Sequence, residues 1–188
     1  MHILIDLDNV AADLMKKWLD VYNSEYNDTL LPGQIKTWQI ELFASKCSPR
    51  EFHTIIERAE FFADLEVIKN SIEVTSRLQD LGHEIYFVTA TPYDNPTAGY
   101  DKCNWVQKHF PHIGKTRVIQ AHHKHMIKGD ILFDDGPINL QNFHGIKVAM
   151  DFEYNKNVAV NYRVSNWLDF EKIIHQIMAM RKSNSGAK

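Results

Sequence analysis

The sequence has few cysteines and no long apolar stretch. Only two of its 188 residues are cysteines, Cys47 and Cys103, and their spacing fits neither a Cys-x-x-Cys zinc site nor a disulfide framework. A reducing cytoplasm is therefore the expected location. No stretch approaches the roughly 18 apolar residues of a membrane helix, and the N-terminus enters an apolar segment without a basic, cleavable signal, so we expect no membrane association.

The sequence also lacks a large excess of charge of either sign. A net charge of −3 provides no bulk attraction to nucleic acid, so polymeric nucleic acid is not an expected partner. The hydrophobic fraction of 44% and the charged fraction of 24% are typical of a globular protein. The length suits one domain, or one domain with a small insertion. The oligomeric state stays open, a homodimer included.

An apolar segment at the start of the chain stops at two aspartates. Residues 3–5 are apolar and rich in β-branched side chains, which favours a strand that is buried on both faces of a parallel sheet. Asp6 and Asp8 follow at the carboxyl end of this strand, the edge at which α/β sheets bind ligands. An aspartate at a strand end can also simply cap a turn. This motif alone leaves both interpretations open.

Strand and helix signals alternate through most of the chain. Further short apolar strands are expected at residues 84–88, 116–119, 131–133 and 147–150. Helices are expected at residues 72–81, ended by Gly82, at residues 100–110, and after Asn166, with a frayed tail over residues 181–188. This alternation predicts an α/β fold with a doubly wound, Rossmann-like parallel sheet.

The segment between the first two strands carries no strand signal. Helices are expected there over residues 11–22, 35–44 and 49–63, the last with Ser48 as its N-cap and Pro49 in its first turn. The segment is longer than an ordinary crossover needs. We therefore predict a small helical cap, residues 14–72, inserted after the first strand into a core formed by residues 1–13 and 73–188.

Polar residues end three of the predicted strands. They are Asp6 with Asp8, Thr89, and Asp134 with Asp135. In a parallel sheet these strand ends share one edge. Four carboxylates there would repel one another unless a cation lay among them, and oxygen ligands without histidine or cysteine favour Mg²⁺. Because Mg²⁺ keeps positions open for water and for a phosphate oxygen, the site is linked to phosphoryl chemistry.

Two lysines, Lys124 and Lys128, compete to supply positive charge to such a site. The strand expected at residues 116–119 runs toward the catalytic edge, so Lys124 follows it near that edge. The chain must then return before the next strand, which places Lys128 toward the opposite edge. A strand of about five residues, at roughly 3.3 Å each, separates the two edges by more than a lysine can reach. Lys124 is therefore favoured, with Lys128 as the alternative.

Taken in order, these motifs resemble those of the haloacid dehalogenase-like (HAD) superfamily of phosphatases. The shared pattern is a strand with Asp-x-Asp-x-Val at residues 6–10, a strand ending at Thr89, a lysine, and a strand ending in Asp-Asp. Within this superfamily the chain is most similar to the 5′(3′)-deoxyribonucleotidases, over residues 5–13, 61–66, 102–106 and the Lys-x9-Asp-Asp motif at 124–135. That family usually has glycine where this chain has Asn9, and its loop after the second strand differs.

The resemblance implies a Mg²⁺-dependent phosphomonoesterase that removes phosphate from nucleoside monophosphates through an aspartyl-phosphate intermediate. Asp6 would be the nucleophile and Asp8 the general acid and base. The metal ligands would be Asp6, Asp8 through its backbone carbonyl, and Asp135, while Asp134 would orient a ligand or the lysine. Thr89, Lys124 and Lys102 would bind the phosphate. Phe61, Phe62 and Trp38 are candidates to stack on the base, although aromatic residues at helical spacing are more often core.

Two alternatives stay open. The same chemistry could act on another small phosphomonoester, such as a sugar phosphate. A non-catalytic, Mg²⁺-binding regulatory domain that is phosphorylated on aspartate would also carry acidic residues, a threonine and a lysine at its strand ends. The Asp-x-Asp motif and the size of the helical insertion speak against this second alternative.

Overall fold

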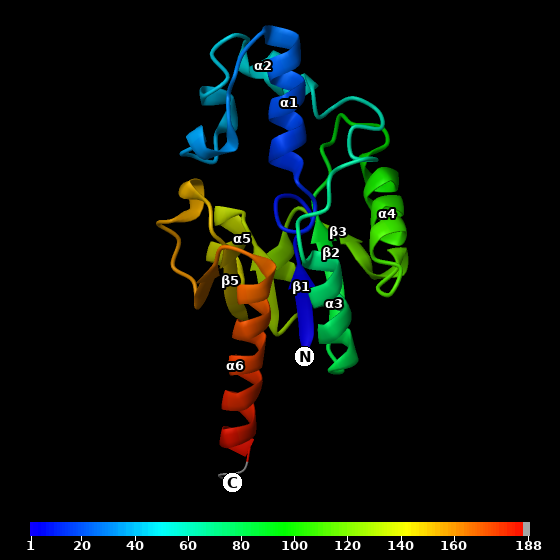
Figure 1. Ribbon diagram of the computed structural model, residues 1–188, viewed down its shortest axis with the longest axis vertical. Coiled ribbons are helices and arrows are strands. Elements are labelled where there is room, and N and C mark those ends of the chain that lie inside the picture. The colour runs from blue at the N-terminus through cyan, green and yellow to red at the C-terminus, as the bar shows by residue number, and fades with distance from the viewer. Residues whose placement is uncertain (186–188) are drawn as a thin grey trace.

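A six-stranded parallel sheet forms the centre of the protein, for which a computed structural model describes the chain from Met1 to Ser185 (Figure 1). The strand order is β3-β2-β1-β4-β5-β6, and each neighbouring pair is parallel. The strands are β1 (His2–Ile5), β2 (Glu84–Thr89), β3 (Val118–Gln120), β4 (Ile131–Asp134), β5 (Ile146–Met150) and β6 (Tyr162–Val164). The predicted doubly wound α/β fold is confirmed.

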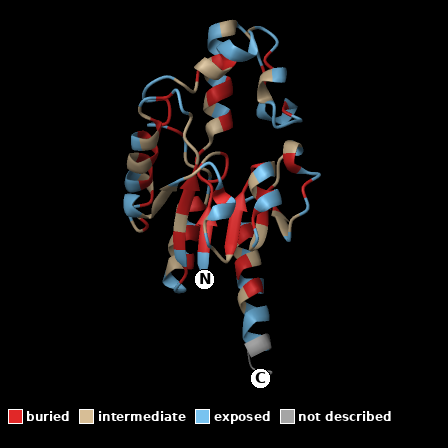
Figure 2. Ribbon diagram, turned by 180° about the vertical axis from the view of Figure 1, so that it is seen from behind, coloured by how far each residue is buried: buried red, intermediate tan, exposed pale blue. Residues whose placement is uncertain are grey.

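Both faces of the sheet are covered. On one face, strand residues such as Ile3 and Phe133 form a core with α3 (Ser71–Asp80), α4 (Ala98–His109) and α6 (Trp167–Ser185). On the other face Leu4 packs with Phe143, and α5 (Pro137–Asn142) packs against β5 through Leu140. Figure 2 shows the strands buried along most of their length. Burial on both faces explains why the strands are continuous apolar runs in the sequence.

Local signals set the ends of several helices as predicted. The Ser48 side chain accepts a hydrogen bond from the N–H of Glu51, whose carboxylate accepts one from the N–H of Ser48, and this capping box starts α2 (Pro49–Thr54). Gly82 follows α3 with φ of +80°, a left-handed conformation that glycine adopts freely. Asn166 caps α6 by accepting from the N–H of Asp169 at 3.0 Å.

A helical segment is inserted between β1 and α3. The chain leaves and returns through two adjacent stretches, in which Asp13 N–H donates to the Glu66 carbonyl and Ile68 N–H to the Ala11 carbonyl, both at 2.8 Å. The insertion holds α1 (Leu14–Tyr26), α2 and two short 3-10 turns at Pro32–Gln34 and Ile40–Leu42. Figure 1 shows α1 and α2 beyond one end of the sheet. The domain boundaries at residues 14 and 72 stay a prediction.

Two helices predicted in this insertion need correction. The helix over residues 35–44 is wrong, because Ile35 is buried while Trp38 and Leu42 are exposed, so the apolar side chains form no common buried face. The helix over residues 49–63 ends at Thr54. Beyond it, the carbonyls of two residues accept hydrogen bonds from the Asn95 side chain instead of continuing the helix.

Smaller corrections concern the ends of other elements. β3 begins at Val118, because Lys115–Arg117 form a 3-10 turn, and the three-residue strand β6 was missed. α1 begins at Leu14, because the Asp13 side chain caps it by accepting from the N–H of Lys16. α6 continues to Ser185, so the tail predicted from residue 181 is helical that far, and residues 186–188 lie outside the described part.

Among the residues that the structure describes, no helix combines the length and the apolar character needed to span a membrane.

Candidate active site

The carboxyl ends of three adjacent strands bring the predicted polar residues together. Asp6 and Asp8 follow the central strand β1, while its neighbours β2 and β4 end at Thr89 and Asp134. The N–H of Asp6 donates to the carbonyl of Phe133 at 2.8 Å, so the pairing of β1 with β4 continues to this aspartate. The topology therefore gathers these side chains at one edge of the sheet.

Three buried carboxylates lie at this edge. Asp6, Asp134 and Asp135 expose at most 6% of their surface, and each offers an oxygen within 4.8 Å of the others. Burial raises the pKa of Asp6 well above its usual range, and neighbouring aspartates raise it further against the opposing effect of Lys124. Burial and the charge of Asp134 raise the pKa of Asp135 to about 7. These acids resist ionising together unless cations balance them.

Lys124 balances two of these acids. Its Nζ lies 2.6 Å from Asp6 Oδ1 and 2.8 Å from Asp134 Oδ2, and its side chain is almost fully buried. Burial lowers the pKa of Lys124, but the charges of Asp134 and Asp6 outweigh this effect and the net pKa is raised. Asp134 also accepts hydrogen bonds from the N–H of Gly136 and from the Asn139 amide. The predicted lysine and the predicted supporting aspartate are thus in contact.

Lys102 reaches the same edge from α4. Its Nζ donates to Asp8 Oδ2 at 2.5 Å, to Thr89 Oγ1 at 3.0 Å and to the carbonyl of Ala90 at 2.6 Å. The side chain is fully buried, and its ammonium group lies 4.4 Å from the centre of the Phe62 ring. The Lys102 ammonium group therefore lies at the edge that carries Asp8 and Thr89, with its three N–H groups directed to protein oxygens.

The donor set fits a hard divalent cation. Asp8 Oδ1 is buried and accepts no hydrogen bond from any residue that the structure describes, although buried carboxylate oxygens normally have a partner. When every side chain is ionised, the four aspartates at this edge carry four negative charges and the two lysines carry two positive charges. The net charge is then −2. All the free ligands are oxygens, the donor type preferred by Mg²⁺.

A cavity of about 180 Å³ opens onto these side chains. The sheet edge contributes Asp6, Asp8 and Lys124 to its lining, and the helical insertion contributes Leu14, Trp18, Trp38 and Ile40. Trp38 is 48% exposed, so part of its side chain is accessible to a ligand. Of the three residues predicted to contact a base, Trp38 is the one that lines this cavity.

Phe61 and Phe62 lie elsewhere. Phe62 is buried beneath Lys102. Phe61 lines a separate cavity of about 540 Å³, where Lys17 Nζ lies 4.7 Å from the centre of its ring. Instead of Phe61 and Phe62, Trp18 lines the cavity at the acidic group. In the sequence, Trp18 was recognisable only as an apolar residue at helical spacing on α1. Its indole is fixed by stacking on Phe52, with ring centres 4.6 Å apart.

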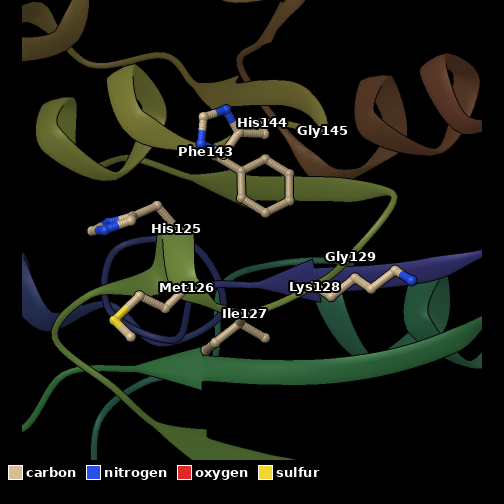
Figure 3. A pocket seen from close by; sticks show the side chains of 8 residues that line it. All are labelled: His125, Met126, Ile127, Lys128, Gly129, Phe143, His144 and Gly145. Atoms are coloured by element: carbon tan, nitrogen blue, oxygen red, sulfur yellow. The ribbon is translucent and has the colours of Figure 1, made fainter.

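Lys128 lies outside this site. It lines a cavity of about 340 Å³ with His125, Phe143 and His144, among others (Figure 3). Two residues later, the N–H of Asp130 donates to the carbonyl of His2 at the start of β1, so the chain has returned to the amino edge of the sheet. The structure thus separates the two competing lysines and brings only Lys124 to the acidic group.

Three side chains that support the acidic group had no motif to identify them. Tyr154 and Asn9 donate to Asp135 Oδ2, and Asn155 donates to the Asp135 carbonyl. The signal at Asn9 was its place beside the aspartates. Tyr154 and Asn155 follow β5 and reach the site only through the fold.

A family model matches almost the whole chain. It is described as 5′ nucleotidase, deoxy (pyrimidine), cytosolic type C protein, and it matches residues 1–182. The chain belongs to this family. Membership in the deoxynucleotidase family agrees with the resemblance drawn from the motifs.

Curated relatives agree over nearly their full length. The 5′(3′)-deoxyribonucleotidase of Clostridium acetobutylicum is 33% identical over 173 residues, which cover 92% of this chain and 94% of the relative. The 5′(3′)-deoxyribonucleotidase of Bacillus subtilis is 34% identical over 171 residues, covering 90% and 96%. The similarity therefore includes both the sheet and the helical insertion.

Solved structures of the HAD superfamily share the fold of this deoxynucleotidase-family chain. A haloacid dehalogenase-like protein of unknown function from Agrobacterium tumefaciens superposes with a TM-score of 0.63 at 10% identity, covering 94% of this chain and 98% of that one. A HAD-hydrolase from Bacillus subtilis, bound to magnesium, gives a TM-score of 0.56 at 12% identity, covering 92% of this chain and 97% of that one. At these identities the likeness concerns the fold alone.

Proposed function

We propose that the protein is a Mg²⁺-dependent phosphomonoesterase that hydrolyses nucleoside monophosphates in the manner of a 5′(3′)-deoxyribonucleotidase. The observation that carries this proposal is the meeting of Asp6, Asp8 and Asp135 with Lys124 and Lys102 at one sheet edge. Membership in the deoxynucleotidase family supports the substrate class.

In the first step the Asp6 carboxylate attacks phosphorus, and the bond from phosphorus to the ester oxygen breaks. Asp8 gives its proton to the departing alkoxide, which leaves as the nucleoside. Lys124 and the N–H of Leu7 both donate to Asp6 Oδ1, at 2.6 and 2.7 Å, and so hold the nucleophile in one orientation.

In the second step a water molecule attacks the phosphorus of the aspartyl phosphate. Asp8 now takes a proton from this water, the bond from phosphorus to Asp6 breaks, and inorganic phosphate leaves with both aspartates restored.

The metal would be held by Asp6, Asp135 and the backbone carbonyl of Asp8. When bound, Mg²⁺ supplies positive charge that offsets the phosphate dianion. The raised pKa values of the buried acids Asp6 and Asp135 support a cation at this position. Asp134 would hold Lys124 in position through the ion pair between them.

Phosphate oxygens would be bound by Lys102, Lys124 and Thr89. The two ammonium groups form ion pairs with different aspartates at this edge: Lys102 pairs with Asp8, and Lys124 pairs with Asp6. A phosphoryl group between them would receive donors from two directions, which is the arrangement that stabilises charge on its equatorial oxygens.

The base would be bound by the aromatic wall of the insertion. Trp38 and Trp18 line the cavity that also contains Asp6, and stacking on an aromatic ring suits any nucleobase.

We include a cytoplasmic location in the proposal. The family description, which names a cytosolic type, and the two unpaired cysteines support it.

The test is a comparison of kcat/KM, with Mg²⁺ present, for ribo- and deoxynucleoside monophosphates phosphorylated at the 5′ or 3′ position and for sugar phosphates. We expect nucleoside monophosphates to exceed sugar phosphates by at least tenfold, the order of discrimination that one apolar pocket provides. Asp6→Asn should abolish turnover of all of them, and Asp94→Asn, at an exposed position, is the control.

Equal turnover of a sugar phosphate would overturn the nucleotide part of the proposal. Phosphorylation of the protein without multiple turnover would instead indicate a regulatory phospho-acceptor.

A further inference from the structure

The carboxylate of Asp135 is held by two side chains at the same oxygen. Oδ2 accepts a hydrogen bond from Tyr154 Oη at 2.5 Å and another from Asn9 Nδ2 at 3.1 Å. No donor of the described residues bonds to Oδ1. A carboxylate fixed through one oxygen can turn little about its own axis, so the other oxygen keeps one direction.

Asn9 is anchored at its other end. Its Oδ1 accepts from the N–H of Met15, in the first turn of α1, at 2.8 Å. Its backbone has φ of +57°, a left-handed conformation that asparagine tolerates and glycine adopts freely. A glycine here would keep the turn but lose both hydrogen bonds. The asparagine therefore connects the start of the inserted helix to Asp135.

Tyr154 is fixed by rings on two sides. It stacks on Phe152 with ring centres 5.1 Å apart, and it meets the Trp38 ring edge-on at 5.4 Å. The turn that carries it is tied to Asp135 a second time, because Asn155 Nδ2 donates to the Asp135 carbonyl at 2.9 Å. Arg163 of β6 in turn donates to Asn155 Oδ1. The phenol hydroxyl consequently reaches Asp135 from a rigid support.

We propose that Asn9 and Tyr154 are positioning residues that orient Asp135 for cation binding. The proposal rests on the proposed function only in taking Asp135 as a metal ligand. Neither side chain would touch the cation or the phosphate, and each acts through Asp135. Hydrogen-bond partners of metal ligands typically contribute 10- to 100-fold to metal affinity.

The experiment is titration of the metal-free protein with MgCl₂ by calorimetry, without substrate. We compare the wild type with Tyr154→Phe, Asn9→Gly and the double variant. Tyr154→Phe removes one hydroxyl and leaves both ring contacts, and Asn9→Gly suits the left-handed backbone. Tyr100→Phe is the matched control, since Tyr100 is 73% exposed and its hydroxyl bonds to none of the described residues.

We expect each single variant to raise the Kd for Mg²⁺ by about tenfold and the double variant to raise it further. The control should bind as the wild type does. The melting temperature of metal-free Tyr154→Phe should stay near that of the wild type, while that of metal-free Asn9→Gly should fall because the Met15 N–H loses its partner. In each variant the increase in melting temperature on adding MgCl₂ should shrink. With nucleotide present, more Mg²⁺ should be needed for half-maximal rate, while kcat at saturating Mg²⁺ recovers.

Wild-type affinity for Mg²⁺ in Tyr154→Phe and in Asn9→Gly would overturn the proposal, and so would a wild-type protein that binds no Mg²⁺. A structural role alone would lower the melting temperature of the metal-free variants and leave the Mg²⁺-induced shift unchanged. Because the readout is binding, weakened Mg²⁺ affinity in a protein without phosphatase activity would refute the proposed function and leave this inference standing.

Discussion

At the scale of single residues, Lys124 is shared between two buried carboxylates. Its ammonium group contacts Asp6 and Asp134, while Lys128 is exposed on another part of the surface. The sequence favoured Lys124 on two grounds, the edge of the sheet at which each lysine would lie and the Lys-x9-Asp-Asp motif of the resemblance. The first of these succeeded because a strand is longer than a lysine side chain.

Lys124→Met should destabilise the fold and reduce catalysis. Removing one partner from a buried ion pair costs about 3–5 kcal/mol, because the remaining charge has no compensation. We expect a loss of that order in the free energy of unfolding, measured with urea, and a fall in kcat/KM of at least about 100-fold. Lys128→Met is the control and should change neither quantity appreciably. Loss of activity in the control with retention in Lys124→Met would contradict the assignment.

The raised pKa values of Asp6 and Asp135 predict how pH and Mg²⁺ act together. In the metal-free fold the pKa of Asp135 is about 7, above its value of 3.8 in a free chain. The folded state therefore binds protons more tightly, and the stability from this group is present below about pH 4 and is lost as the pH rises through 7. Mg²⁺ needs the ionised carboxylates and should offset this loss.

We consequently expect saturating MgCl₂ to raise the melting temperature more at about pH 8 than at about pH 6. Thermal unfolding with and without MgCl₂ at both pH values measures the difference. An equal shift at both pH values, or a larger one at the lower value, would show that these acids do not bind the metal in their ionised form.

At the scale of elements, the loop after β2 fastens the returning part of the insertion. Asn95 is 7% exposed, its amide donates to the carbonyls of Ile56 and Arg58, and its Oδ1 accepts from the N–H groups of Thr97 and Ala98. These bonds explain why the predicted helix over residues 49–63 ends early. A periodic pattern in the sequence carries no information about a partner that lies about forty residues away.

Asn95→Ala should leave these backbone groups without partners. An unpaired buried polar group costs about 1–3 kcal/mol, so we expect a loss of at least 2 kcal/mol or so in the free energy of unfolding. We also expect faster proteolysis within residues 55–60. Asp94→Ala, an exposed neighbour, is the control. Unchanged stability and unchanged cleavage in Asn95→Ala would show that these bonds do not hold the insertion.

The elements that sequence reasoning found best are those whose signal is local. The strands with continuous apolar runs, Gly82 after α3 and Ser48 before α2 are examples, because each is specified by adjacent residues. The path of residues 35–44 depends instead on which of their side chains pack against the rest of the protein. Ile35 is buried in this way, whereas Leu42 is exposed. That choice belongs to the tertiary fold.

At the scale of the whole molecule, the site lies between the sheet edge and the insertion. The meeting of the aspartates, Thr89 and Lys124 could be predicted, because each lies at or just after the end of a strand, at the same edge of a parallel sheet. Carboxylates and a lysine are also recognisable in the sequence as groups that bind metal and phosphate. Tyr154 could not, because it follows the fifth strand and reaches Asp135 only through the packing of a loop. Of the three aromatic residues predicted to contact a base, Trp38 lines the cavity, whereas Phe61 lines another cavity and Phe62 packs against Lys102.

Trp38→Ala tests the aromatic wall of the insertion. Loss of stacking on a base costs about 1–3 kcal/mol, so kcat/KM for nucleoside monophosphates should fall by about tenfold or more, mainly through KM. At saturating Mg²⁺, turnover of a small phosphomonoester without a base should change little. Leu42→Ala, also exposed on the insertion, is the control. An equal loss for both kinds of substrate would mean that Trp38 does not contact the base.

The proposed role of Asp6 as the nucleophile requires a phosphorylated protein in the first turnover, which acid quenching with radiolabelled deoxynucleoside monophosphate detects. In the presence of Mg²⁺ we predict a transient, hydroxylamine-sensitive phosphoryl label on the wild-type protein that maps by mass spectrometry to Asp6. Asp6→Asn should acquire no label and release no phosphate. A label on another residue, or wild-type phosphate release by Asp6→Asn, would contradict this role.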